Sequence, residues 1–254
     1  MDGSRSGPSQ AEERMMASTD DVLVADVAPW RGLVRTGAWA ALASVAMIVL
    51  QIGIYVIWPP PQTTAEFYAV LAANPVRGVL ALDVLYVVSN LLAFLVYLAL
   101  AVVLWRVSRS AVVVALAFGV LGMAAYMASP RAVEMLVLSR SYATVEPAEQ
   151  VALLATGDGM LATWMGTAFD VYYFFNLATL LVLAILIYRS AVFSRPVAWW
   201  GLVAAVLMAV PSNFGAVGLA FALASLVPWS VFAVLVARRL LALAAPEGEG
   251  REAR

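Results

Sequence analysis

Long blocks of apolar residues, interrupted mainly by arginine, constrain this chain more than any other feature of its sequence. The blocks run for about 20 residues with almost no charge, which is the length that an α-helix needs to cross the ~30 Å hydrocarbon core of a bilayer. A soluble domain averages about 25% charged residues, whereas only 12% of these 254 residues are charged. The chain is therefore predicted to fold as an all-α integral membrane protein.

The apolar blocks predict a six-helix transmembrane bundle within residues 29–241. The predicted spans cover about 37–58, 79–105, 110–129, 162–188, 197–212 and 217–237. The last two form one apolar stretch that Pro, Ser, Asn and Gly interrupt at 211–215, a composition that is typical of a turn. Residues 1–28 are polar and are predicted to be a disordered cytoplasmic tail, and residues 242–254 are predicted to be a charged cytoplasmic tail.

The arginines alternate between the two ends of the predicted spans and thereby predict the orientation of the bundle. Eight lie in connections on one side and four more in the two tails, twelve in all, against three in connections on the other side. The eight are Arg31, Arg35, Arg106, Arg109, Arg189, Arg195, Arg238 and Arg239, and the three are Arg77, Arg131 and Arg140. Because basic residues accumulate in cytoplasmic loops, both termini are predicted to be cytoplasmic.

The two long connections, residues 59–78 and 130–161, fall on the opposite side and contain further helical patterns. These are a capping box from Thr63 to Glu66 and two helices over about 131–140 and 147–156, the second ended by Gly157-Asp158-Gly159. The resulting amphipathic helices are predicted to lie on the extracytoplasmic side. They would rest on the outer leaflet, cap the bundle, or serve only as connections.

Three residue types that carry much of enzyme chemistry are missing from the chain. Cys and His number 0, and all basic residues are Arg. These absences exclude a thiolate nucleophile, a His base, His-ligated haem, the usual zinc sites and a lysine Schiff base. With a net charge of −1, the chain has no basic face for nucleic acid. We therefore expect no cofactor and no enzymatic activity, although a carboxylate-only metal site or acid–base work by Asp or Glu is compatible with the composition.

Asp83 and Asp170 are the only acidic residues within the predicted spans, and they lead the candidate functional site. An ionised carboxylate is costly in lipid, so each should face the bundle interior, reach water or take up a proton. Tyr86, Asn90 and Tyr97 follow Asp83 at i+3, i+7 and i+14, which places all four on one face of a helix. The spacing predicts a polar stripe along span two.

A similar run after Asp170 indicates an internal repeat of two spans. Tyr173 and Asn176 follow Asp170 in the order in which a tyrosine and an asparagine follow the first aspartate. Repeats of this kind are common in transporters, whose sites lie at the repeat interface. Asp170 and Tyr173 share a helical face, but Asn176, six residues after the aspartate, is predicted to point elsewhere, so two equivalent half-sites are not expected.

Three interpretations of these candidate residues stay open. The functional one is an outward-facing polar cavity, lined by both aspartates and their tyrosines, that binds or transports a small solute or ion. The structural one is interhelical hydrogen bonding, worth ~0.6–2 kcal/mol per contact. In the third, Asp83 simply reaches water at the outer end of its span. The alternative function is a structural or regulatory subunit of a membrane complex, whose outer helices dock onto a membrane-protein partner or a second copy.

The predicted inner connection between spans four and five resembles a known family. Residues Tyr188 to Pro196, followed by Trp200-Gly201-Leu202, are similar to the inner loop of the DUF4386-like bacterial multi-pass membrane proteins. In that family a span typically ends in an Arg-Ser pair, and the next span begins with an aromatic-Gly step. The order Ser194-Arg195-Pro196 departs from the pattern, which would place proline before the basic residue.

The resemblance extends to both ends of the predicted bundle. Arg35-Thr36-Gly37 resembles the family's start of span one, while Pro211 to Gly218 and Leu226 to Trp229 ahead of Arg238-Arg239 resemble its last two spans. It covers about residues 35–240. The resemblance implies a multi-pass protein of the bacterial plasma (inner) membrane, from a family without a characterised activity. It transfers no activity, cofactor or site residue.

Overall fold

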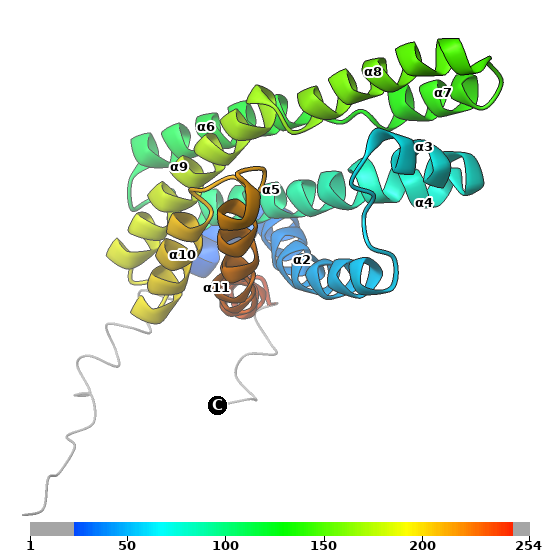
Figure 1. The fold of residues 1–254 in the computed structure, drawn as a ribbon. Helices are drawn as coiled ribbons and strands as arrows, with labels where there is room; N and C mark the ends of the chain where they lie inside the picture. Colours follow the sequence, from blue (N-terminus) through cyan, green and yellow to red (C-terminus); the bar gives the residue numbers. More distant parts are fainter. Residues whose placement is uncertain (1–22, 246–254) are drawn as a thin grey trace, which may run out of the picture.

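The computed structural model describes residues 23–245, and within that range the chain is helical and contains no strand. Figure 1 shows long helices that are broken at a few positions. Residues 23–27 form a helical turn that leads into the first labelled element. The elements are η1 (Ala28–Trp30), α2 (Arg31–Ile57), α3 (Thr64–Ala73), α4 (Pro75–Val79), η2 (Leu80–Val84, a π-helix), α5 (Leu85–Leu104), α6 (Arg109–Met127), α7 (Ala132–Tyr142), α8 (Pro147–Trp164), α9 (Thr167–Arg189), α10 (Arg195–Leu207) and α11 (Gly215–Leu243). The predicted all-α class is confirmed.

Five helical segments within the described residues are long and apolar enough to cross a bilayer. They are Leu23–Ile57, Pro75–Leu104, Arg109–Tyr142, Pro147–Arg189 and Gly215–Leu243. Each covers one of the predicted spans to within one residue. The remaining predicted span, 197–212, corresponds to α10, which has 13 residues. A helix of that length rises only about 20 Å, less than the ~30 Å of the hydrocarbon core, so α10 alone is too short to cross.

One end of the bundle, here called the arginine-rich end, holds the starts of α2, α6 and α10 and the ends of α5, α9 and α11. The eight arginines of the shorter connections belong to these helix ends. Arg106 forms an ion pair with Asp26, and the Arg239 Nε donates a hydrogen bond of 2.8 Å to the Val192 carbonyl. The basic groups therefore gather at one end of the structure, as the sequence predicts.

The main apolar cluster fills this end of the bundle. Val34 and Ala38 of α2 pack there with Leu100 of α5 and with residues of α9, α10 and α11. Leu23 and Val27 belong to the same cluster, so the predicted disordered tail is wrong for residues 23–28, because burial of these side chains orders that segment. The rest of that tail, residues 1–22, lies outside the described residues.

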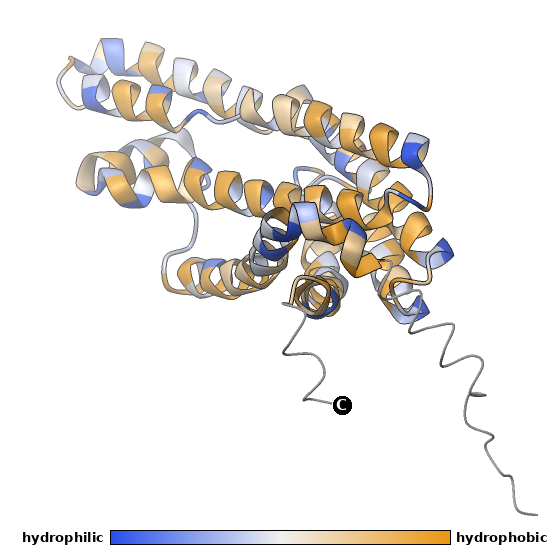
Figure 2. Ribbon diagram, turned by 180° about the vertical axis from the view of Figure 1, so that it is seen from behind, coloured by the Kyte–Doolittle hydropathy of each residue, from blue (hydrophilic) through white to orange (hydrophobic). Residues whose placement is uncertain are grey.

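A second apolar cluster holds α3, α4, α7 and α8 together as an outer extension at the opposite end. Its buried members are Phe67, Tyr68, Leu71, Leu82, Ala132 and Met135. Figure 1 shows α7 and α8 running side by side with α3 and α4 against them. Figure 2 shows that the long helices are mainly hydrophobic, with hydrophilic residues toward the loops. The outer helices therefore pack on one another around a core of their own.

Hydrogen bonds fix α3 within the outer extension. One half of the predicted capping box is present, because the Thr63 side chain accepts the Glu66 N–H at the start of α3, while the Glu66 carboxylate accepts the Gln62 N–H at 2.7 Å. Thr64 donates its hydroxyl to the Asp158 carboxylate, and Tyr68 donates to the Leu153 carbonyl at 2.9 Å. Burial, and secondarily the Asp158 charge, raise the pKa of the Tyr68 phenol. Tyr68 therefore stays a neutral hydrogen-bond donor.

The predicted end of the second outer helix at Gly157-Asp158-Gly159 is wrong, because α8 continues to Trp164. Gly157 has a packing role inside this helix. A Cβ added there would lie 2.4 Å from the Tyr68 hydroxyl, so only glycine permits α3 to approach α8 this closely. The glycine that resembles a helix stop is thus a contact point between two helices.

Candidate functional site

A cavity of about 290 Å³, here called the tyrosine cavity, lies among α2, α5, α9 and α11 in the half of the bundle nearer the outer extension. Its volume is at the lower end of the ~300–1,000 Å³ of small-molecule pockets. Its polar lining consists of Ser44, Gln51, Tyr55, Tyr86, Ser89, Asn90, Tyr97, Tyr172, Tyr173, Asn176, Ser212 and Ser225. Apolar residues, among them Trp229, complete the lining, which contains no charged side chain.

Two reciprocal hydrogen bonds between α5 and α9 form one wall of this cavity. Tyr97 donates its hydroxyl to the Asn176 Oδ1 at 2.8 Å, and Tyr172 donates in the opposite direction to the Asn90 Oδ1. Tyr97 is 3% exposed and Asn176 7%. Because each tyrosine uses an asparagine oxygen as acceptor, the arrangement orients the two amide groups. Asn176 has no further hydrogen-bond partner for its amide nitrogen among the described residues.

Aromatic packing closes the tyrosine cavity toward the arginine-rich end. The rings of Tyr97 and Trp229 meet edge to face with centroids 6.4 Å apart. Trp229 also contacts Phe232, whose side chain is fully buried, at 5.8 Å. Trp229 stands in the middle of α11 and packs inside the bundle. It belongs to the main apolar cluster and also lines the cavity, so the cavity borders directly on that cluster.

The loop between α10 and α11, residues 208–214, covers the cavity at its other end. Tyr173 donates its hydroxyl to the Ser212 Oγ at 3.2 Å. Gly215 begins α11 with a φ of +61°, a conformation that L side chains rarely adopt. A Cβ on Gly218 would lie 2.2 Å from the Pro211 carbonyl oxygen. The turn residues that interrupt the apolar sequence thus bring Ser212 over the cavity.

The tyrosine cavity reaches the outside of the bundle between the outer halves of α2 and α11. Ile52 of α2 and Leu219 and Leu223 of α11 line the cavity and are also exposed on the bundle surface. Within α2, the Gln51 amide nitrogen donates to the Tyr55 hydroxyl at 3.2 Å. In a bilayer, this sideways opening would face lipid rather than water.

Asp83 supports a helix junction and is not among the residues that line the cavity. Its side chain is 7% exposed, and its Oδ2 accepts the backbone N–H of Ala132, the first residue of α7. A carboxylate at a helix N-terminus is stabilised by the unpaired N–H groups there. Asp83 itself stands in η2, so its side chain connects this π-helix to α7.

Asp170 also supports a junction, at the start of α9. The Asn213 Nδ2 donates to the Asp170 Oδ1 at 2.8 Å and to the Met165 carbonyl at 2.7 Å. This pair of bonds ties the α10–α11 loop to the break between α8 and α9. Neither aspartate lines the cavity, so the arrangement differs from the functional interpretation, in which both carboxylates line one cavity.

The other four candidates, Tyr86, Asn90, Tyr173 and Asn176, all line the tyrosine cavity. Asn176 lies at i+3 from Tyr173 and shares the cavity-facing side of α9 with it, whereas Asp170 lies outside the lining. The sequence also identifies Gln51 as a buried polar candidate.

Tyr55, Tyr172 and the lining serines are additional residues of the site. The sequence contains a signal for Tyr55, because it follows Gln51 at i+4 in an otherwise apolar span and therefore lies on the same face of the helix. Tyr172, next to Tyr173, carries no such signal, because adjacent residues on a helix do not share a face.

Within residues 23–245 there is no group of three or more carboxylates placed to hold a metal ion. The sequence profile of a family described as "Domain of unknown function (DUF4386)" matches residues 36–243. This range agrees with the stretch of about 35–240 that the short motifs indicate. No curated protein and no solved structure matches the chain.

Proposed function

The chain belongs to the DUF4386 family, whose description gives no activity. From the geometry of the chain, we propose that it is a multi-pass membrane protein that binds a small, uncharged, amphiphilic molecule in the tyrosine cavity. The observation that carries this proposal is a lining that is polar, aromatic and free of charge. The site would retain or transfer such a molecule without chemical change.

The absence of charge from the lining determines the class of ligand. An ion inside the bundle would lose its hydration, and no opposite charge in the lining compensates for that loss. An uncharged ligand avoids this cost. The Asn176 amide nitrogen is available to donate to its polar group, and the Tyr173 hydroxyl, which donates to Ser212, can still accept from that group. Trp229 and Leu226 would contact its apolar part.

The sideways opening determines the route of access. It is bordered by Ile52, Leu219 and Leu223, which offer apolar contacts to a molecule that arrives from the lipid phase. A ligand dissolved in the bilayer would enter there without crossing the loop at residues 208–214. We therefore propose an amphiphile that partitions into the membrane as the natural occupant.

The proposed orientation follows from the arginines. With the arginine-rich end at the cytoplasm, the cavity opens in the outer leaflet and the outer extension projects from the membrane. α9 has 23 residues and rises about 35 Å, which is enough to cross the hydrocarbon core, whereas the 18 residues of α8 precede it beyond a break and belong to the outer extension. In this arrangement α10 and the loop at 208–214 together make the sixth crossing.

Cysteine labelling tests the proposal directly, because the chain has no natural cysteine. The variant Ser225→Cys places a thiol in the cavity and is treated with small methanethiosulfonates that are neutral, cationic or anionic. We expect the neutral reagent to react at least about tenfold faster than either charged reagent. Equal rates for the cationic and neutral reagents, or no reaction with any of them, would contradict an uncharged binding site.

A pair of matched variants distinguishes the cavity from the surface of the same helix. Ala222 lines the cavity, whereas Ala224 is exposed on the outside of α11. Added to Ser225→Cys, Ala222→Phe should abolish labelling and Ala224→Phe should leave it unchanged. In native mass spectra of protein released from its own membranes, a small uncharged molecule should accompany the wild type and Ala224→Phe but not Ala222→Phe.

The alternative function, a subunit that docks through its outer helices, is favoured by one separate observation. Val133 and Val137, one turn apart on α7, are exposed in the outer extension. If this face binds a partner, Val137→Glu should reduce the size of the complex on native gels of gently solubilised membranes. An unchanged size, together with loss of the bound molecule in Ala222→Phe, would favour the binding function.

A further inference from the structure

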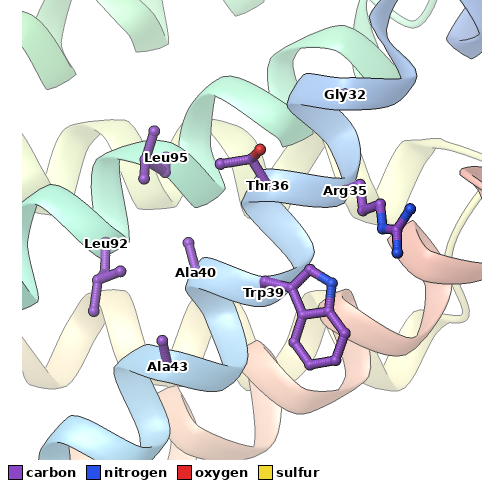
Figure 3. A pocket seen from close by; sticks show the side chains of 8 residues that line it. All are labelled: Gly32, Arg35, Thr36, Trp39, Ala40, Ala43, Leu92 and Leu95. Carbon is purple, nitrogen blue, oxygen red and sulfur yellow. The ribbon is translucent and has the colours of Figure 1, made fainter.

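A groove of about 460 Å³ runs along the outside of α2 and α5 at the arginine-rich end (Figure 3). It shares no lining residue with the tyrosine cavity. The inner sides of the same two helices are in close contact, since a Cβ on Gly37 would lie 2.2 Å from the Ala99 Cβ. The groove is therefore a feature of the bundle surface between two firmly packed helices.

The start of the groove presents hydrogen-bond donors. Arg35, Thr36 and Trp39 line it, all three are exposed, and no acidic side chain lines the groove. Neither the Arg35 guanidinium, the Thr36 hydroxyl nor the Trp39 indole N–H has a hydrogen bond or ion pair within residues 23–245. A positive charge beside two further donors fits an anionic group, and an arginine fork fits the oxygens of a phosphate.

The rest of the groove is apolar. Figure 3 shows Arg35 and Thr36 near the start of α2, and Ala40, Ala43 and Leu92 further along the two helices. The alanines leave space against α2, and leucines of α5 form the opposite wall. The site thus joins an anion-binding end to an apolar channel along the helix axis, which is the chemistry of a phospholipid rather than of a soluble anion.

We propose that this groove binds one anionic phospholipid, with its phosphate at Arg35 and an acyl chain along Ala40, Ala43 and Leu92. Trp39 lies beside the glycerol region, where an indole ring combines apolar contact with an N–H donor. The cytoplasmic leaflet, on which the arginine-rich end is predicted to lie, carries the anionic lipids of a cell membrane. The lipid would hold α2 and α5 at the headgroup level, independently of any ligand in the tyrosine cavity.

Lipid titration of the purified full-length protein in detergent tests this site. The probes are dioleoylphosphatidylglycerol, which is anionic, and dioleoylphosphatidylcholine, which is zwitterionic, and native mass spectrometry reports the fraction of protein with one bound lipid. We expect the anionic lipid to bind about tenfold more tightly. Arg35→Gln should remove that preference, whereas Arg109→Gln, which changes an exposed arginine of the same end outside the groove, should retain it.

A second pair of matched variants tests the apolar part of the groove, where the acyl chain would lie. Ala43→Trp fills the channel and should weaken both lipids about tenfold, while Ala46→Trp, on an exposed position of α2 outside the groove, should have no effect. Equal losses in Arg35→Gln and Arg109→Gln would overturn the proposal in favour of general charge attraction. Displacement of the lipid by glycerol phosphate, with no effect of Ala43→Trp, would overturn it in favour of a phosphate site.

Discussion

The hydroxyl group of Tyr97 offers the sharpest test of how α5 and α9 are held together at the tyrosine cavity. In the variant Tyr97→Phe, the ring contact with Trp229 remains, but the Asn176 oxygen loses its 2.8 Å hydrogen bond. Leaving a buried acceptor unpaired costs about 1–3 kcal/mol in water-soluble proteins. Measured interhelical bonds in membranes average about 0.6 kcal/mol and reach about 1.7 kcal/mol. We expect a loss of about 1 kcal/mol, or about 2–4 °C in Tm for a chain of this size.

A double-mutant cycle separates this bond from the general cost of truncation. The free energy of unfolding is measured in mixed micelles of increasing SDS content for Tyr97→Phe, Asn176→Ala and the double variant. The expected coupling is about 0.6–1.7 kcal/mol. The matched cycle combines Tyr97→Phe with Asn90→Ala, because Asn90 accepts from Tyr172 instead and should couple to Tyr97 by less than about 0.5 kcal/mol.

Two results would refute the reasoning. A coupling below about 0.3 kcal/mol between Tyr97 and Asn176 lies within the additivity of independent sites and would mean that the bond contributes nothing to stability. Equal coupling of Tyr97 to Asn176 and to Asn90 would mean that the tyrosine has no preferred partner. Either result would mean that the specific hydrogen bond between Tyr97 and Asn176 does not hold α5 and α9 together.

Three further predictions concern packing, the outer junction and orientation. Gly37→Ala should destabilise the protein by about 1–3 kcal/mol in the same unfolding assay through overpacking against α5, whereas Gly53→Ala, with open space around its Cβ, should not. Asp83→Ala leaves the first N–H of α7 unpaired and should cost about 1–3 kcal/mol in that assay; an unchanged unfolding midpoint would contradict a structural role. In intact cells, a membrane-impermeant maleimide should label Thr144→Cys, while Ser194→Cys should react only after permeabilisation, and the reverse pattern would invert the proposed topology.

The candidate site shows where sequence periodicity is sufficient and where it fails. Tyr86 and Asn90 lie on a regular α-helix, so their shared face follows from the period of 3.6 residues, and both line the cavity. Asp83 stands in the π-helix η2, where that period does not apply, and its carboxylate binds α7 instead. Asp170 lies in the first turn of α9, where Asn213 of a distant loop binds it.

The sequence by itself determined the class of structure. Lipid offers no hydrogen-bond partners, so apolar segments of spanning length must satisfy their backbone groups within helices. The positions of the arginines place the polar ends of those helices together, and short motifs identify the family. These properties depend on composition and local spacing, because each segment partitions into lipid or water according to its own residues.

Only the tertiary structure decided which side chains meet. The partners Tyr97 and Asn176 stand 79 positions apart, and their meeting depends on the rotation of α5 and α9 about their own axes. Close contacts set such rotations, as where Gly37 allows α2 to approach α5. The tyrosine cavity and the lipid groove likewise lie between helices, and no single segment contains the information for either, because packing between helices is a property of pairs of surfaces.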